Sequence, residues 1–200
     1  MDFTSILEEA SARSGVSEIA TRFDTILTLA ERYLNRALKG ASRSTTTISV
    51  TTDANGDYNL PSDYNGLKSV FKNKQKLHNA TEQYVRGFEG KNGFYIQGTT
   101  LKSQLPNTDL SISYYANLPT LKTNTTNWLS DEDSEIYIYA VMWQGITFAS
   151  MKAKDRAQID ILSTKIGPAK AYLDELISQY KENDRLNRIS GIRVNIGAIQ

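Results

Sequence analysis

The sequence predicts an α+β protein with an antiparallel helical-bundle core, a small inserted antiparallel β-sheet region and an extended C-terminal arm. Apolar residues recur at helical spacing towards both ends, whereas the middle of the chain alternates with period two among threonine, serine and asparagine. A length of 200 residues suffices to bury a sizeable core. We therefore expect a helical core from residues 1–40 and 128–186, a β-rich insertion over 41–127 and a docking arm over 187–200.

The first zone predicts a short helix and then a long one that stops at Gly40. Gly15 interrupts the pattern, and Ser17 is a suitable N-cap for the second helix. One apolar stripe follows three-or-four spacing: Ile19, Phe23, Ile26, Leu27, Ala30, Leu34, Ala37 and Leu38. The charged residues off this stripe, Glu31 among them, are expected on a solvated face.

The middle zone predicts short strands separated by turns. The expected strands cover residues 47–51, 66–74, 76–80, 94–97, 99–103 and 109–115. Asn92-Gly93 and Gly98 supply residues that tolerate the positive φ of hairpin turns. Thr81 is expected to cap one helical turn within this sheet region.

The last helical zone contains a start signal and an interruption. Ser130 and Asp133 resemble a capping box, and the surrounding acidic run suits a helix N-terminus better than a metal site. The helix that they open is expected to end near Ala153. A second long pattern contains Gly167-Pro168, which predicts a kink or break near Lys165.

The final segment alternates again, with apolar residues at every second or third position and no acidic residue after Asp184. This pattern is typical of a strand, although the segment follows a helix. Two possibilities stay open: the segment pairs with the chain's own sheet, or it docks on another subunit by strand addition.

The composition argues against an enzyme. The chain has no cysteine and one histidine, His78, so thiol nucleophiles, thiolate metal sites and multi-histidine metal sites are excluded. No Walker-type loop or nucleophile elbow is present, and no cofactor is expected. His78 is expected to be exposed or on an edge strand. A net charge of +1 also argues against a nucleic-acid binder that acts through bulk electrostatics.

Four lysines form a possible basic stripe if their strand is continuous: Lys68, Lys72, Lys74 and Lys76. Such a stripe could line a DNA channel, meet a neighbouring subunit or discourage edge-to-edge aggregation. Of these, protection of the edge is favoured.

The sequence gives no signal for a membrane. The first nine residues are acidic, unlike a signal peptide, and the longest apolar stretch, 136–149, is too short to span a bilayer. We expect a soluble protein that is made in the cytoplasm.

Three motifs, in this order, resemble the head–tail adaptor proteins of tailed bacteriophages. The first is Leu60-Pro61-Ser62-Asp63-Tyr64, the second Tyr114-Tyr115-Ala116-Asn117-Leu118-Pro119-Thr120-Leu121, and the third Asn124-Thr125-Thr126-Asn127-Trp128-Leu129 before a tyrosine-rich helix. The resemblance covers about residues 17–186. The sequence departs from the family pattern at Gly167-Pro168, where the last helix is usually less interrupted.

The resemblance implies a structural virion protein without enzymatic activity that forms a ring, a dodecamer by family analogy, beneath the portal. The ring would join the DNA-filled capsid to a tail or nozzle protein and let genomic DNA pass without sequence-specific binding. The arm would dock on the portal protein through Arg188, Ile189, Ile192, Arg193, Val194, Ile196 and Ile199. The alternative is a carbohydrate-binding tail module, which the threonine- and asparagine-rich strands and the aromatic residues would suit.

Overall fold

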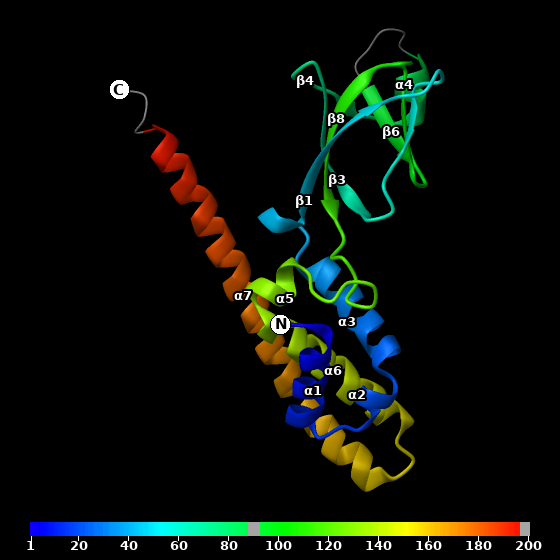
Figure 1. Cartoon of the computed structure of the whole chain (residues 1–200). Coiled ribbons are helices and arrows are strands. Elements are labelled where there is room, and N and C mark those ends of the chain that lie inside the picture. The colour runs from blue at the N-terminus through cyan, green and yellow to red at the C-terminus, as the bar shows by residue number, and fades with distance from the viewer. Residues whose placement is uncertain (88–92, 197–200) are drawn as a thin grey trace. The chain divides into compact units, whose positions relative to one another are not determined.

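A computed structural model describes the backbone of residues 1–87 and 93–196, and the side chains of residues 1–85 and 93–188. The chain folds as two compact units (Figure 1). The helical unit consists of Met1–Ser42 and Leu118–Gln200, and the β unit of Arg43–Asn117. The α+β class that the sequence predicts is confirmed.

The helical unit begins with three helices rather than the two expected. α1 (Phe3–Ser14) is capped by Asp2, whose carboxylate accepts the Ser5 N–H at 2.8 Å. Gly15 ends the helix in the left-handed region, at φ 67°. α2 (Glu18–Thr21) and α3 (Phe23–Ala37) follow, and the Ser17 side chain makes no cap hydrogen bond with α2.

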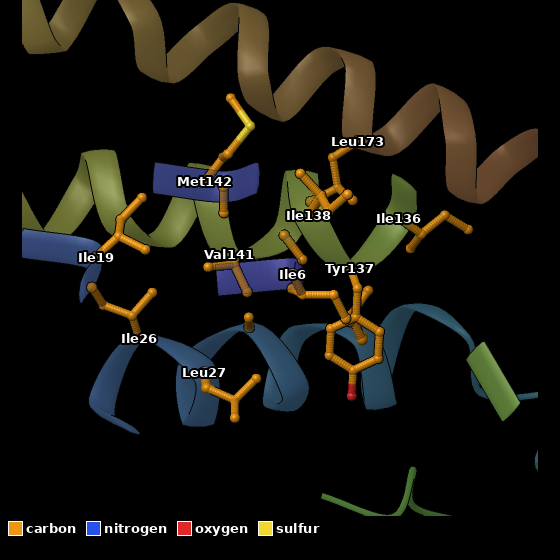
Figure 2. Close-up of a cluster of buried hydrophobic side chains, with 14 of the residues drawn as sticks. Ile6, Ile19, Ile26, Leu27, Ile136, Tyr137, Ile138, Val141, Met142 and Leu173 are labelled. Carbon is orange, nitrogen blue, oxygen red and sulfur yellow. The ribbon is translucent and has the colours of Figure 1, made fainter. Parts of the chain in front are cut away.

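The second part of the helical unit contains α5 (Trp128–Glu132), α6 (Ser134–Lys152) and α7 (Arg156–Ile196). α6 packs against α1, α3 and α7, and its buried residues point in nearly every direction around the helix axis (Figure 2). A helix that is apolar all round has to be enclosed by others. α6 is therefore the central element of this unit, and its end at Lys152 confirms the expected boundary.

The cap of the α5–α6 region is placed differently from the prediction. Asn127 is the N-cap of α5, and Ser130 is the third helical residue of the capping box that Asn127 opens. Asp133 precedes α6 and makes no side-chain cap hydrogen bond. The prediction placed the cap three residues late because the acidic run that follows Ser130 also suits a helix start.

Of the kink or break expected near Lys165, the break is wrong, since α7 is one helix that includes Pro168. A proline inside a helix removes one backbone hydrogen bond and costs about 3 kcal/mol. Leu162, Ala169 and Leu173 are buried on either side of it, and this packing holds both halves of the helix in place. Pro168 itself is exposed, and Gly167 has open space around it, so the ring needs no room in the core.

The expectation of an extended C-terminal arm is also corrected, because residues 187–196 continue α7 as a helix. Once a helix has formed, each further residue adds one backbone hydrogen bond at little cost. A helix can therefore continue into a segment whose residues favour strands, because that preference depends on packing against a neighbouring strand. Ile199 lies outside the described residues.

The β unit contains two four-stranded sheets, with strand orders β1-β8-β3-β4 and β2-β7-β6-β5. The first sheet comprises β1 (Thr45–Thr51), β8 (Asp109–Ala116), β3 (Tyr64–Lys72) and β4 (Gln75–Lys76). The second comprises β2 (Asp57–Asn59), β7 (Thr100–Ser103), β6 (Gly93–Gln97) and β5 (His78–Asn79). A 3-10 turn, η1 (Ser42–Ser44), precedes β1.

The β unit differs from the single antiparallel sheet expected, because two sheets form and β5 pairs with β6 in parallel. Between these two strands lies α4 (Glu82–Gly87), whose first turn is capped by the Thr81 hydroxyl as predicted. The helical turn carries the chain back to the start of β6, which a parallel pairing requires. The core of the unit consists of Leu60, Val70, Leu77, Phe94, Leu101, Leu110, Ile112 and Tyr114.

Candidate functional site

A buried carboxylate, Glu31 on α3, lies at the centre of a polar network in the helical unit. It is 8% exposed, and it accepts hydrogen bonds from the Thr120 hydroxyl at 2.8 Å and the Leu121 N–H at 2.9 Å. The Tyr137 hydroxyl of α6 also donates to it, at 3.2 Å. Burial, and then the charge of Glu31, raise the pKa of Tyr137, so this phenol remains a donor.

Asn127 extends this network. Its Nδ2 donates to the Pro119 carbonyl at 2.7 Å and to the Tyr137 hydroxyl at 2.9 Å, while its Oδ1 accepts the N–H groups of Leu129 and Ser130. All four hydrogen-bonding positions of this buried amide are therefore used.

The network fixes the segment that enters the helical unit after β8. Leu118 N–H donates to Asn35 at 2.7 Å, and Thr120 and Leu121 bind Glu31. Leu118 and Leu121 are buried on the same core. The second and third sequence motifs therefore act together to hold residues 118–121 against α3 and α6.

The expectation that Glu31 faces solvent is wrong. Glu31 follows the buried Ala30 and is within one turn of Leu27, so helical spacing alone allows a position at the margin of the apolar stripe. The sequence signal that could have revealed the burial of Glu31 lies in the second and third motifs. Their threonine and asparagine side chains carry donors that need an acceptor when they are buried.

The first motif has a corresponding role in the β unit. The Tyr114 hydroxyl donates to the Asp63 carboxylate at 3.0 Å, and the Asn117 N–H donates to the Asp63 carbonyl at 2.7 Å. Burial, and then the hydrogen bond to Asp63, raise the pKa of Tyr114 to about 12. Asp63 therefore ties the start of β3 to the end of β8.

The expected portal-docking residues from Arg188 to Ile196 lie in the last part of α7. Arg188 is half exposed and donates to the Gly40 carbonyl at 3.2 Å and to Asp184. Asp184 also accepts from the backbone N–H of Ser42 at 3.1 Å and from its hydroxyl. We call these contacts of Asp184 and Arg188 with residues 40–42 the α7 clasp.

The structure places Ile189, Ile192, Arg193, Val194 and Ile196 on the final turns of the same helix. Beyond Tyr180, the described side chains, residues 181–188, include none that is buried, and only Asp184 is shielded in part. This part of α7 therefore contributes nothing to the hydrophobic core of its own unit.

The four lysines do not lie on one continuous strand. Lys68 and Lys72 belong to β3, and Lys76 to β4, which turns back on β3 through Asn73 and Lys74 at positive φ. A register shift between Leu67 and Ser69 also separates Lys68 from the rest. Lys72, Lys74 and Lys76 thus gather at one short hairpin, where Lys74 and Lys76 are exposed.

The helical unit has a partly apolar groove of about 540 Å³ beside α7. It is lined by residues of α1, α6 and α7, including Tyr139, Met142, Pro168 and Tyr172. The rings of Tyr139 and Tyr172 lie 4.5 Å apart, and Tyr172 is 44% exposed. Arg13, Ser14, Thr164 and Lys165 also line it, so the groove is apolar only in part.

No group of acidic, histidine or cysteine residues within the described part of the chain could hold a metal ion. His78 lies exposed on β5, as predicted. None of the described helices has the length and apolar character needed to cross a membrane.

Comparison with known proteins gives one family. The model of the SU10 adaptor protein family matches residues 1–194. No curated protein matches the chain. Proteins of this phage head–tail adaptor family are structural components of the virion that interact with portal and tail proteins. The chain belongs to the SU10 adaptor protein family.

Proposed function

We propose that copies of this chain form a ring beneath the portal that joins the DNA-filled capsid to the tail and leaves a channel for DNA. The observation that carries this proposal is the match to an adaptor family over residues 1–194. The ring would be a dodecamer by analogy with other adaptors. Family membership favours this function over the carbohydrate-binding module.

The last turns of α7 are the proposed portal-docking surface. Side chains 181–188 contribute nothing to the core, so a partner can cover them without unfolding the unit. Arg188 would meet an acidic group of the portal protein, and the apolar residues from Ile189 to Ile199 would fill pockets there.

The docking proposal can be tested by co-sedimentation with the portal protein. We expect truncation after Leu186 to abolish binding and Arg188→Gln to weaken it. Arg185→Gln is the matched control, because Arg185 is exposed on the same helix and pairs only with Glu182 among the contacts described for it. Undiminished binding by the truncated chain would overturn this part of the proposal.

The lysine hairpin would face either the DNA channel or a neighbouring subunit. Replacing Lys72, Lys74 and Lys76 by glutamine separates these roles in particles that carry the variant. Normal rings with an altered rate of DNA release would support the channel, because phosphate contacts depend on positive charge. Loss of the ring would instead support a subunit interface, and an unchanged particle would contradict both roles.

A further inference from the structure

β1 is a long, open sheet edge. It has seven residues, whereas β2 has three and β4 and β5 have two each. Edge strands are usually protected by lysine, proline, a bulge or short length. β4 is short and lies beside lysines, but β1 has the uncharged sequence Thr-Thr-Thr-Ile-Ser-Val-Thr and pairs with β8 without a register shift. β1 therefore lacks the usual protection against pairing with another chain.

The backbone groups that β1 leaves open follow from its register. Thr52 N–H donates to the Thr108 carbonyl at 3.0 Å, which continues the β1–β8 pairing by one residue. In an antiparallel ladder, alternate residues direct both backbone groups towards the same neighbour. Residues 46, 48 and 50 therefore bond to β8, and Thr47, Ser49 and Thr51 direct their N–H and C=O groups away from the sheet.

The side chains of β1 show the same division. Thr47, Ser49 and Thr51 are exposed, whereas Ile48 and Val50 are half-buried and pack on the edge of the β-unit core. The apolar layer thus reaches the edge strand and is left partly uncovered there. An added strand would cover Ile48 and Val50 and would satisfy the open backbone groups.

We propose that β1 pairs antiparallel with β1 of a second copy of this chain, with the two-fold axis at Ile48. In this register Thr47 faces Ser49 of the second copy and Thr45 faces its Thr51, so all seven residues of each strand are paired. Ile48 lies opposite its own copy, and Val50 lies opposite Thr46. The half-buried apolar residues of both copies then form one continuous layer.

The lack of charge is the reason for choosing a second copy as the partner. Symmetric pairing places the same strand on both sides of the contact, so charges of one sign on that strand would face charges of the same sign and repel them. The lysine hairpin at the opposite edge of this sheet would do so, and β1 would not. A two-fold contact closes on two copies and cannot continue around a cyclic ring. We therefore assign this dimer to the free chain before it joins a particle, independently of portal docking.

The oligomeric state of the full-length chain tests the proposal, measured by analytical ultracentrifugation and native mass spectrometry. We expect a dimer for the natural chain and for Ser49→Val, and a monomer for Ser49→Pro. Proline at position 49 removes the outward N–H that would bond to the second copy, and an edge strand tolerates proline at such a position. Valine keeps this N–H, so it should keep the dimer. Ser49→Lys provides a second disrupting variant, should Ser49→Pro lose its native circular dichroism. A monomeric natural chain, or dimers that persist in folded Ser49→Pro or Ser49→Lys, would overturn the proposal.

A cross-link tests the register, because the natural chain contains no cysteine. Facing residues in a non-hydrogen-bonded antiparallel pair are close enough for a disulfide. Ile48→Cys should therefore give a covalent dimer on mild oxidation, with the yield lost when Ser49→Pro is added. Ser49→Cys is the control, since Ser49 faces Thr47 of the other copy. Equal cross-linking by both variants, or none by Ile48→Cys, would contradict the proposed axis.

Discussion

The helical unit buries a polar network around Glu31, whereas the β unit has a row of polar side chains on its edge strand β1. Glu31, Asn127 and Tyr137 are buried and satisfied, and they hold the connection from β8 against α3 and α6. β1 instead presents an exposed row of hydroxyl side chains and open backbone groups. The same kinds of polar group thus serve two purposes: in the helical unit they hold residues 118–121 on α3, and in the β unit they lie along an exposed strand.

The largest expected effect comes from removing the buried acceptor. Glu31→Ala leaves two hydroxyls and one backbone N–H without their partner and should reduce the free energy of unfolding of the helical unit by about 3 kcal/mol. Glu31→Gln keeps the shape and one acceptor oxygen, so it should cost about 1 kcal/mol. Both tryptophans, Trp128 and Trp143, belong to the helical unit, so urea unfolding followed by tryptophan fluorescence measures this unit selectively.

Arg32→Ala is the matched control, because Arg32 is the exposed neighbour of Glu31 on α3. A surface substitution of this kind should change stability by no more than about 0.5 kcal/mol. If Glu31→Ala were as mild as Arg32→Ala, the network would not hold the connection and the contrast between the units would be lost.

Two glycine substitutions in the helical unit should change its stability in opposite directions. At Gly145 of α6, a Cβ would lie 2.3 Å from Cγ1 of the buried Ile19, so Gly145→Ala should lower stability by about 1 to 2 kcal/mol. At Gly167 of α7 there is open space, and Gly167→Ala should raise stability by about 1 kcal/mol. Thermal unfolding monitored at 222 nm measures both; equal signs would mean that α6 and α7 are packed alike.

The sequence predicted the elements whose signals are local, and failed where a distant partner decides the outcome. The α3 stripe and the Thr81 cap were found because spacing and capping act within one or two turns. The burial of Glu31 depends on donors about ninety residues away in the sequence. The continuity of α7 through Pro168 depends on packing against α6, which outweighs the local cost of proline.

The candidate site follows the same division. The motifs pointed to the adaptor family, and in the structure the three motifs form two hydrogen-bonded clusters, one around Glu31 and one around Asp63. The lysine stripe depended on a continuous strand, and this condition is not met, because β3 turns back into β4 at Asn73 and Lys74. Alternation in the final segment predicted a strand, although the helix that precedes it continues to Ile196.

A smaller effect is expected in the β unit from Tyr114→Phe. Loss of the hydrogen bond to Asp63 should destabilise this unit by about 1 kcal/mol and leave the tryptophan-detected transition unchanged. In the natural chain this contribution is complete below the ordinary tyrosine pKa of about 10 and is lost as the pH rises through the folded value of about 12. Amide hydrogen exchange of β3 and β8 measures the effect. Tyr58→Phe is the control, and an equal loss of protection there would mean that the Asp63 contact adds nothing.

The smallest expected effect concerns the α7 clasp. Burial raises the pKa of Asp184, but hydrogen bonds from Ser42 and Arg188 outweigh it, so the folded-state pKa lies below the ordinary value. A depressed pKa means that the clasp contributes its full stability above about pH 4 and that this stability is lost as the pH falls through the folded-state pKa.

Asp184→Asn should speed amide exchange in residues 181–188 at neutral pH, with little change in global unfolding, because it removes the acceptor of the clasp. Glu182→Gln is the control: it removes a carboxylate that binds Arg185 on the same helix, keeps the contact with Ser42, and should speed exchange in residues 181–188 less than Asp184→Asn does. Equal exchange in the two variants would mean that α7 is held by its own helical hydrogen bonds rather than by Ser42, and that its final turns are already free for a partner.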